Sequence, residues 1–150
     1  MSRFWDMGWR QIPIRRQPYR KCYIILGAGT RCTSPLADIA WEGDSKEALS
    51  AFPAEVKSTF GFSLRRLQNG ELPRCGVRPM ASVGKGVWEL KTDDACTWYR
   101  IMYLSQIQGV IYVLHAFEKD SSKTDRRDIE IAKNRLKDVH QRLREGGKAQ

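Results

Sequence analysis

The segment Val110–Thr124, VIYVLHAFEKDSSKT, constrains the fold most, because its composition changes abruptly from apolar to polar. Its first five residues are β-branched or aromatic with one leucine, which is typical of a strand that is buried on both faces. His115 and Phe117 then share one face, because strand side chains alternate. The polar residues after Phe117 form a loop that can cap a following helix. The sequence therefore predicts a strand that builds core up to Leu114 and places an ionisable ring where the strand meets solvent.

Two roles are open for His115. A lone histidine at a strand end is usually a structural residue that is hydrogen-bonded to the backbone. Strand ends are also common places for chemistry, and histidine is the side chain that titrates near neutral pH. Charged and aromatic residues on the neighbouring strands support the chemical role of His115 as well as its structural role.

Length and charge bound the class of protein. At 150 residues the chain is long enough for one domain with a proper core and too short for two. The formal net charge of +9 indicates an acidic partner, most commonly nucleic acid. Residues 1–35 hold seven Lys/Arg and one acidic residue, whereas residues 36–150 hold 19 and 16. The main domain is therefore only mildly basic.

The cysteine pattern argues against a metal site. Cys22, Cys32, Cys75 and Cys96 are too widely spaced for zinc, and disulfide frameworks belong to smaller secreted chains, so we expect free thiols. No run approaches the about 18 apolar residues of a membrane span, and the N-terminal region does not fit a signal peptide. We expect a cytoplasmic protein with no metal, no membrane contact and no small-molecule cofactor.

Residues 1–35 are predicted to be a basic, mostly disordered leader. Gly27-Ala28-Gly29 superficially suggests a nucleotide-binding turn, but Cys32 stands where the third glycine would fall. Two alternatives remain for the leader. It is either an upstream sequence translated from an early start codon, with no role of its own, or an arm that touches RNA. The residues of such an arm would be Trp9, Arg15, Arg16, Arg20 and Lys21.

Helical periodicity predicts a hairpin of two short helices. The first begins with Asp44 or Ser45 as its N-cap, and Pro53 ends or kinks it. The second runs from Pro53 to Asn69, with apolar residues at spacings of four, four and three. The two helices are expected to stack on one another.

The rest of the domain reads as strands and one long helix. The predicted strands are Asp38–Trp41, Val87–Lys91, Thr97–Leu104 and the segment that begins at Val110. Residues 71–86 are expected to form a loop, whose cations Arg78 and Lys85 are either solvated or in contact with RNA. A long helix follows from near Thr124 to Gly146. Its predicted apolar seam comprises Ile129, Ala132, Leu136, Val139 and Leu143.

These elements define the fold class. Their order, β-α-α-β-β-β-α, predicts a small α+β domain over residues 36–146, with a tail at 147–150. The last three strands form an antiparallel meander, flanked by the N-terminal helical hairpin and the C-terminal helix.

Charged side chains on adjacent strands suggest a site. Arg100, in mid-strand, needs either a carboxylate, for which Glu89 is the candidate, or an anionic ligand. The set that could converge on the sheet comprises Lys91, Arg100, Tyr103, His115 and Lys119. Cations, a phenol and an imidazole suit metal-free RNA cleavage through the 2′-hydroxyl, which needs a base, an acid and stabilisation of the phosphorane.

Three stretches together resemble one family. They are WEGDSKEALSAFPAEVKSTFGFSLRRLQNGELP, GKGVWELKTDDACTWYRIMY and VIYVLHAFEKDSSKTDRRDIEIAKNRL. The shared motifs are G-D-S with A-F-P, G-V-x-E-L-K, Y-R-I-x-Y and Y-V-L-H-A-F-x-K before a basic helix. Over about residues 39–143, the chain resembles the phage-derived, HigB-like branch of the RelE/ParE toxin superfamily.

This resemblance implies a toxin of a type II toxin–antitoxin pair, with a small RelE-like sheet flanked by helices. It also implies a cognate helix-turn-helix antitoxin, and action on mRNA in the ribosome. Lys91 and Arg100 would contact the scissile phosphate and the RNA backbone, with His115 and Lys119 near the substrate. The implied contacts with RNA or ribosomal RNA are Lys123, Arg126 and Arg127.

Two other readings stay open beside the ribosome-dependent endoribonuclease. One is a ParE-like toxin that inhibits DNA gyrase without cutting anything. The other is an inactive relative that is bound to an antitoxin or to DNA, which is favoured if the leader blocks the sheet surface. The choice of general base and acid also stays open.

Overall fold

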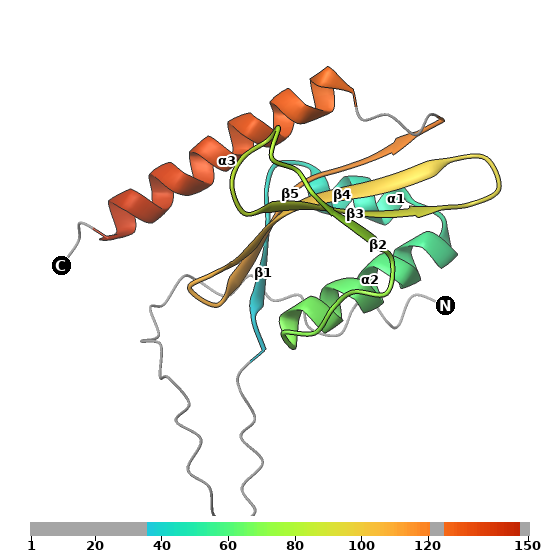
Figure 1. Ribbon diagram of the computed structural model, residues 1–150, viewed down its shortest axis with the longest axis horizontal. Helices are drawn as coiled ribbons and strands as arrows, with labels where there is room; N and C mark the ends of the chain where they lie inside the picture. The colour runs from blue at the N-terminus through green and yellow to red at the C-terminus, as the bar shows by residue number, and fades with distance from the viewer. Residues whose placement is uncertain (1–35, 121–124, 148–150) are drawn as a thin grey trace, which may run out of the picture. The chain divides into compact units, whose positions relative to one another are not determined.

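The computed structural model describes residues 36–120 and 125–147, and the predicted leader and Lys123 lie outside them. Figure 1 shows a mixed α+β arrangement, a sheet with helices on both of its faces, as predicted. In chain order the elements are β1 (Asp38–Trp41), α1 (Ser45–Ala51), α2 (Ala54–Gln68), β2 (Gly76–Pro79), β3 (Val87–Asp93), β4 (Trp98–Ile107), β5 (Val110–Lys119) and α3 (Arg126–Gly147).

The sheet has the strand order β1-β5-β4-β3-β2. The predicted meander is confirmed, since β4 pairs antiparallel with both β3 and β5. β1 joins the edge parallel to β5, with Asp38 opposite Val110. Parallel pairing requires a crossover connection, and here the chain between the two strands includes both short helices and the rest of the sheet.

One expectation about residues 71–86 was wrong. Part of this predicted loop is β2, which pairs antiparallel with β3 and places Gly76 opposite Lys91. Gly76 and Pro79 make β2 difficult to predict from the sequence, because glycine and proline are depleted in strands. Proline is tolerated in β2 because it is an edge strand.

The expected loop directly after Phe117 was also wrong, and so was the expected exposure of the His115 ring, which is buried. β5 continues to Lys119, because β4 supplies backbone partners as far as Trp98. The pairing shifts between Met102, opposite His115, and Tyr103, opposite Val113, so Leu114 is an extra residue on β5. Such a bulge re-aims side chains. Leu114 packs in the cluster with α3, and His115 also bonds to α3.

The two faces of the sheet are covered differently (Figure 1). We call the side that packs against α1 and α2 the hairpin face and the other side the α3 face. On the hairpin face, the rings of Phe52 and Tyr99 meet edge-on with centroids 5.0 Å apart, and Phe60 is fully buried. Leu49, Val56, Leu64, Leu90 and Ile101 are buried as well. This face is a continuous apolar core.

On the α3 face, the predicted apolar seam of α3 is confirmed. Ala132, Leu136 and Val139 are buried in a cluster with the strand residues Val87, Met102, Leu104, Leu114 and Phe117. Met80 and Val83, which follow β2, complete this cluster. The charged residues of β3 to β5 lie beside members of this cluster, since Glu89 is opposite Met102 and Arg100 is opposite Phe117.

The start of α1 differs from expectation in one detail. Asp44 precedes the helix at the N-cap position, but its side chain makes no cap hydrogen bond. The carboxylate binds Arg135 of α3 at 2.6 Å, and the Ser45 hydroxyl donates to the carbonyl of Val113 at 3.2 Å. Both side chains therefore tie α1 to other elements.

Candidate functional site

The register of β2 to β5 gathers four of the five predicted catalytic residues on the α3 face. One cross-strand row is Arg78, Glu89, Met102 and His115, and the next is Gly76, Lys91, Arg100 and Phe117. Trp98 and Lys119 face each other in the row after that. We call Arg78, Lys91, Arg100, His115 and Lys119 the cationic cluster.

Tyr103 does not join this cluster. It follows Met102 directly on β4 and therefore points to the hairpin face. The side chain is buried there, and this burial raises the pKa of the Tyr103 phenol to about 12. The structure therefore does not bring Tyr103 together with the other four residues of the predicted set, because alternation along β4 places it on the face opposite to Arg100.

Glu89 is the centre of the cluster and is fully buried. Its Oε1 accepts a hydrogen bond from Arg100 Nη1 at 3.0 Å, and its Oε2 accepts one from Arg78 Nε at 2.6 Å. Arg100 is only 2% exposed, whereas the Arg78 side chain is 46% exposed. The carboxylate partner that the sequence offered for Arg100 is thus present, and Arg78 carries the accessible charge of this group.

His115 is also held inside the protein. Its Nε2 lies 3.0 Å from Asp128 Oδ1, and its Nδ1 lies 3.4 Å from Arg135 Nη1. A guanidinium can only donate, so Nδ1 is the acceptor and Nε2 carries the proton that is shared with Asp128. The ring stacks on Phe117 with centroids 5.0 Å apart. This network fixes the tautomer and tilt of the imidazole.

Arg135 is a site residue that sequence reasoning missed. Beside His115 it donates to the carbonyl of Leu114 at 2.9 Å and to Asp44 at 2.6 Å. This hydrogen bond to Arg135 is the main reason why the pKa of the Asp44 carboxyl is lowered. Gly43 has φ +57°, and a Cβ there would lie 2.5 Å from the guanidinium. We call Gly43, Asp44 and Arg135 the α3 clip.

Lys119 and Lys91 have different partners. Lys119 Nζ binds Asp125 Oδ2, just before α3, at 2.5 Å. Lys91 Nζ lies 5.7 Å from the centre of the Trp98 ring. Among the described residues, no carboxylate forms an ion pair with Lys91. Lys91 is therefore the member of the cationic cluster whose charge faces an aromatic ring.

A comparison with known families shows the family to which this chain belongs. A family model described as phage-derived protein Gp49-like (DUF891) matches residues 47–137, which is more than half of the chain. The chain belongs to this Gp49-like family. The family is generally recognised as one of RelE- and HigB-like toxins, which implies a toxin-like function and an antitoxin partner. A search of curated proteins found no match.

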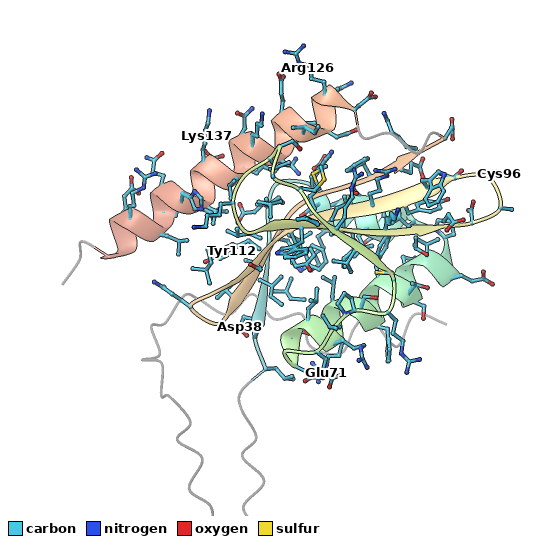
Figure 2. The ribbon with its side chains drawn as sticks, viewed as in Figure 1. Asp38, Glu71, Cys96, Tyr112, Arg126 and Lys137 are labelled. Atoms are coloured by element: carbon cyan, nitrogen blue, oxygen red, sulfur yellow. The ribbon has the colours of Figure 1, made fainter. Side chains whose placement is uncertain are left out.

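In this Gp49-like chain, the match runs from α1 into α3 and includes the whole cationic cluster. The predicted RNA contacts outside that cluster are more scattered. Lys85 is exposed in the turn before β3, and Arg126 and Arg127 are exposed at the start of α3. Figure 2 shows Arg126 and Lys137 projecting from the side of α3 that is turned away from the sheet. Arg126 and Arg127 stand between Asp125 and Asp128, the residues that bind Lys119 and His115 of the cationic cluster.

Within residues 36–120 and 125–147, this Gp49-like domain has neither a metal-binding cluster nor a membrane-spanning helix. No three His, Cys, Asp or Glu side chains in these ranges gather closely enough to hold a metal ion. No helix in the same ranges is long and apolar enough to span a bilayer. Cys75 and Cys96 are free thiols, as expected.

Proposed function

We propose that this chain is the toxin of a type II toxin–antitoxin system and acts as a ribosome-dependent endoribonuclease without a metal. Membership of the Gp49-like family supports the toxin assignment. The observation that carries the nuclease assignment is the cationic cluster, in which side chains from four adjacent strands share one sheet face. The partners are a cognate helix-turn-helix antitoxin, the ribosome and mRNA, in the cytoplasm.

The positive charges of the cationic cluster would stabilise an RNA phosphate whose negative charge increases during the reaction. In the proposed step, the ribose 2′-oxygen attacks phosphorus, the bond from phosphorus to the 5′-oxygen breaks, and a 2′,3′-cyclic phosphate forms. The 2′-hydroxyl proton passes to a base, and an acid protonates the leaving 5′-oxygen. Arg78 and Lys91 would stabilise the equatorial oxygens of the phosphorane. Arg100 would act through Glu89, which holds Arg78 in place.

A second candidate function is supported by the same geometry. Both ring nitrogens of His115 are engaged within the protein, and Tyr103 is buried on the opposite face. Neither therefore stands ready to exchange a proton with substrate. A site with cations but no poised base favours the ParE-like reading, in which the toxin binds DNA gyrase and cuts nothing.

One experiment separates the two candidates. Expression of the nuclease should arrest growth and leave cuts within translated mRNA, and Lys91→Gln and Arg78→Gln should both relieve toxicity. Glu118→Gln, an exposed change on β5, is the matched control and should remain toxic. Inhibition of gyrase supercoiling by purified protein, with mRNA intact, would replace the nuclease by the gyrase toxin.

We also propose that residues 36–146 carry the activity and that residues 1–35 are separable from it. Toxicity should then be the same after residues 1–35 are deleted. Toxicity that appears only after this deletion would instead support the third reading, in which the leader blocks the sheet surface.

A further inference from the structure

Trp98 stands at the open end of the α3 face. It is the first residue of β4 and lies opposite Asp93 of β3 and Lys119 of β5 in the sheet register. Cys96, which Figure 2 labels, marks the turn between β3 and β4 that precedes this residue. The ring is half-buried, so part of its surface is open to solvent.

Two lysines and one aspartate are neighbours of this ring. Lys91 Nζ lies 5.7 Å from the ring centre, Lys119 occupies the position directly across on β5, and Asp93 occupies the position directly across on β3. Lys91 has no carboxylate ion-pair partner among the described residues, whereas Arg100 pairs with Glu89 and Lys119 pairs with Asp125. An aromatic platform with cations beside it is the arrangement with which proteins bind single-stranded nucleic acid.

Its chemistry fits one nucleotide. The indole face can stack on a nucleobase of any sequence, and the neighbouring ammonium group can bind the phosphate attached to it. A duplex does not fit, because its bases are already stacked within the helix. The contact between Lys91 and the ring is weak at a partly exposed position, so a base can replace the lysine above the indole.

We propose that Trp98 and Lys91 form a subsite for one unpaired nucleotide of the RNA chain, adjacent to the cationic cluster. Trp98 stacks on the base, and Lys91 binds the phosphate attached to that nucleotide, which is the phosphate that is cleaved. This assignment rests on the proposed function for its substrate class. It adds a positioning element that explains how a strand of RNA is aligned across β3 and β4.

Binding to a short single-stranded RNA tests the subsite directly. The probe is a six-nucleotide RNA with 2′-O-methyl groups, which cannot be cleaved, and binding to the full chain is measured by anisotropy at low salt. Trp98→Ala should weaken binding by about 5- to 100-fold, and Trp98→Phe should keep most of the affinity. Lys91→Gln should lower the dependence of log K on log salt by about one unit.

Trp88 provides the matched control. It is 37% exposed and lies on the neighbouring strand β3, but it points to the hairpin face. Trp88→Phe should preserve both the affinity and the quenching of tryptophan fluorescence by the probe, whereas Trp98→Phe should abolish most of that quenching. Unchanged binding by Trp98→Ala, equal losses for the two tryptophans, or a duplex that competes as well as the single strand would overturn the subsite.

A separate cleavage assay keeps the two proposals distinguishable. Binding that depends on Trp98, with no cuts in translated mRNA, would retain the subsite and reject the nuclease. Cuts in mRNA that Trp98→Ala leaves undiminished would retain the nuclease and reject the subsite.

Discussion

The two faces of the sheet use the same three strands for opposite purposes. On the hairpin face, β3, β4 and β5 present apolar and aromatic side chains to α1 and α2, and the core there is continuous. On the α3 face, the apolar cluster covers one part of the strands, and the rest carries buried charge. Strand side chains alternate between the two faces, so a residue that packs in the core of the hairpin face is followed by one on the α3 face. The comparison teaches that the hairpin face supplies core packing, whereas the α3 face combines core packing with the charged site.

The largest test of this comparison is Arg100→Ala. We expect the free energy of unfolding to fall by about 3 kcal/mol, because the change removes a buried cation that pairs with the fully buried Glu89 carboxylate. Arg78→Ala should cost less, since that arginine is partly exposed. Denaturant unfolding measures both. Equal losses for the two variants would mean that Arg100 is not an internal counter-ion.

The joint change of Glu89→Leu and Arg100→Met separates stability from activity. Replacement of a buried ion pair by apolar residues of similar volume is often close to neutral for stability. A stable double variant that loses toxicity would assign a functional role to the ion pair, and a stable, toxic one would make it structural.

Gly43→Ala tests the α3 clip and should cost about 1–3 kcal/mol of unfolding free energy. The new methyl group would occupy a left-handed conformation and meet the Arg135 guanidinium. Gly70→Ala is the matched control, with φ +76° and nothing within 4 Å of the added Cβ. A loss equal to that of Gly70→Ala would show that only backbone strain, and not contact with Arg135, is involved.

Tyr103 provides a pH test of the hairpin face. Its pKa is raised from 10.0 to about 12, so the stability it contributes is present below pH 10 and is lost as the pH rises towards 12. At pH 11 this loss is about 1.4 kcal/mol. Unfolding of the wild type and of Tyr103→Phe, compared at pH 8 and pH 11, measures it. The same pH dependence in both proteins would show that the phenol is accessible to water in the fold.

The smallest expected effect is that of Asp44→Asn, about 0.5 kcal/mol or less at neutral pH, because the Asp44 side chain is largely exposed. The pKa of Asp44 is lowered in the fold, so its contribution is present above pH 3.8 and is lost as the pH falls through the folded value. Acid unfolding of wild type and variant should converge at low pH. A difference that persists at pH 2 would point to packing rather than charge.

Much of the architecture could be predicted from local patterns. The apolar seam of α3, the hairpin helices and the meander all follow from periods of 3.6 or 2 that are continuous along the chain. β2 could not be predicted, since a short segment with Gly76 and Pro79 becomes a strand only when β3 pairs with it. The last residues of β5, Glu118 and Lys119, which the sequence assigned to a loop, depend in the same way on their partner strand, β4.

The residues of the site also divide into those that the sequence identified and one that it did not. The sequence identified Lys91, Arg100, His115 and Lys119, because charged residues in strands need an explanation. It missed Arg135, whose position in a basic helix looks like that of its solvated neighbours. The signal that could have found it is Gly43, a glycine in a turn where backbone and side chain approach closely.

By itself the sequence determined the composition of the two faces and the family resemblance, because both depend on patterns of residues that are close to one another in the chain. Only the tertiary structure decided which charges meet. The partners of Glu89 lie 11 residues away on either side, and Asp44 and Arg135 are 91 residues apart. Distances of that kind are fixed by strand register and by the bulge at Leu114. The strand from Val110 thus carries His115 to α3, where the fold, and not the local pattern, gives it its partners.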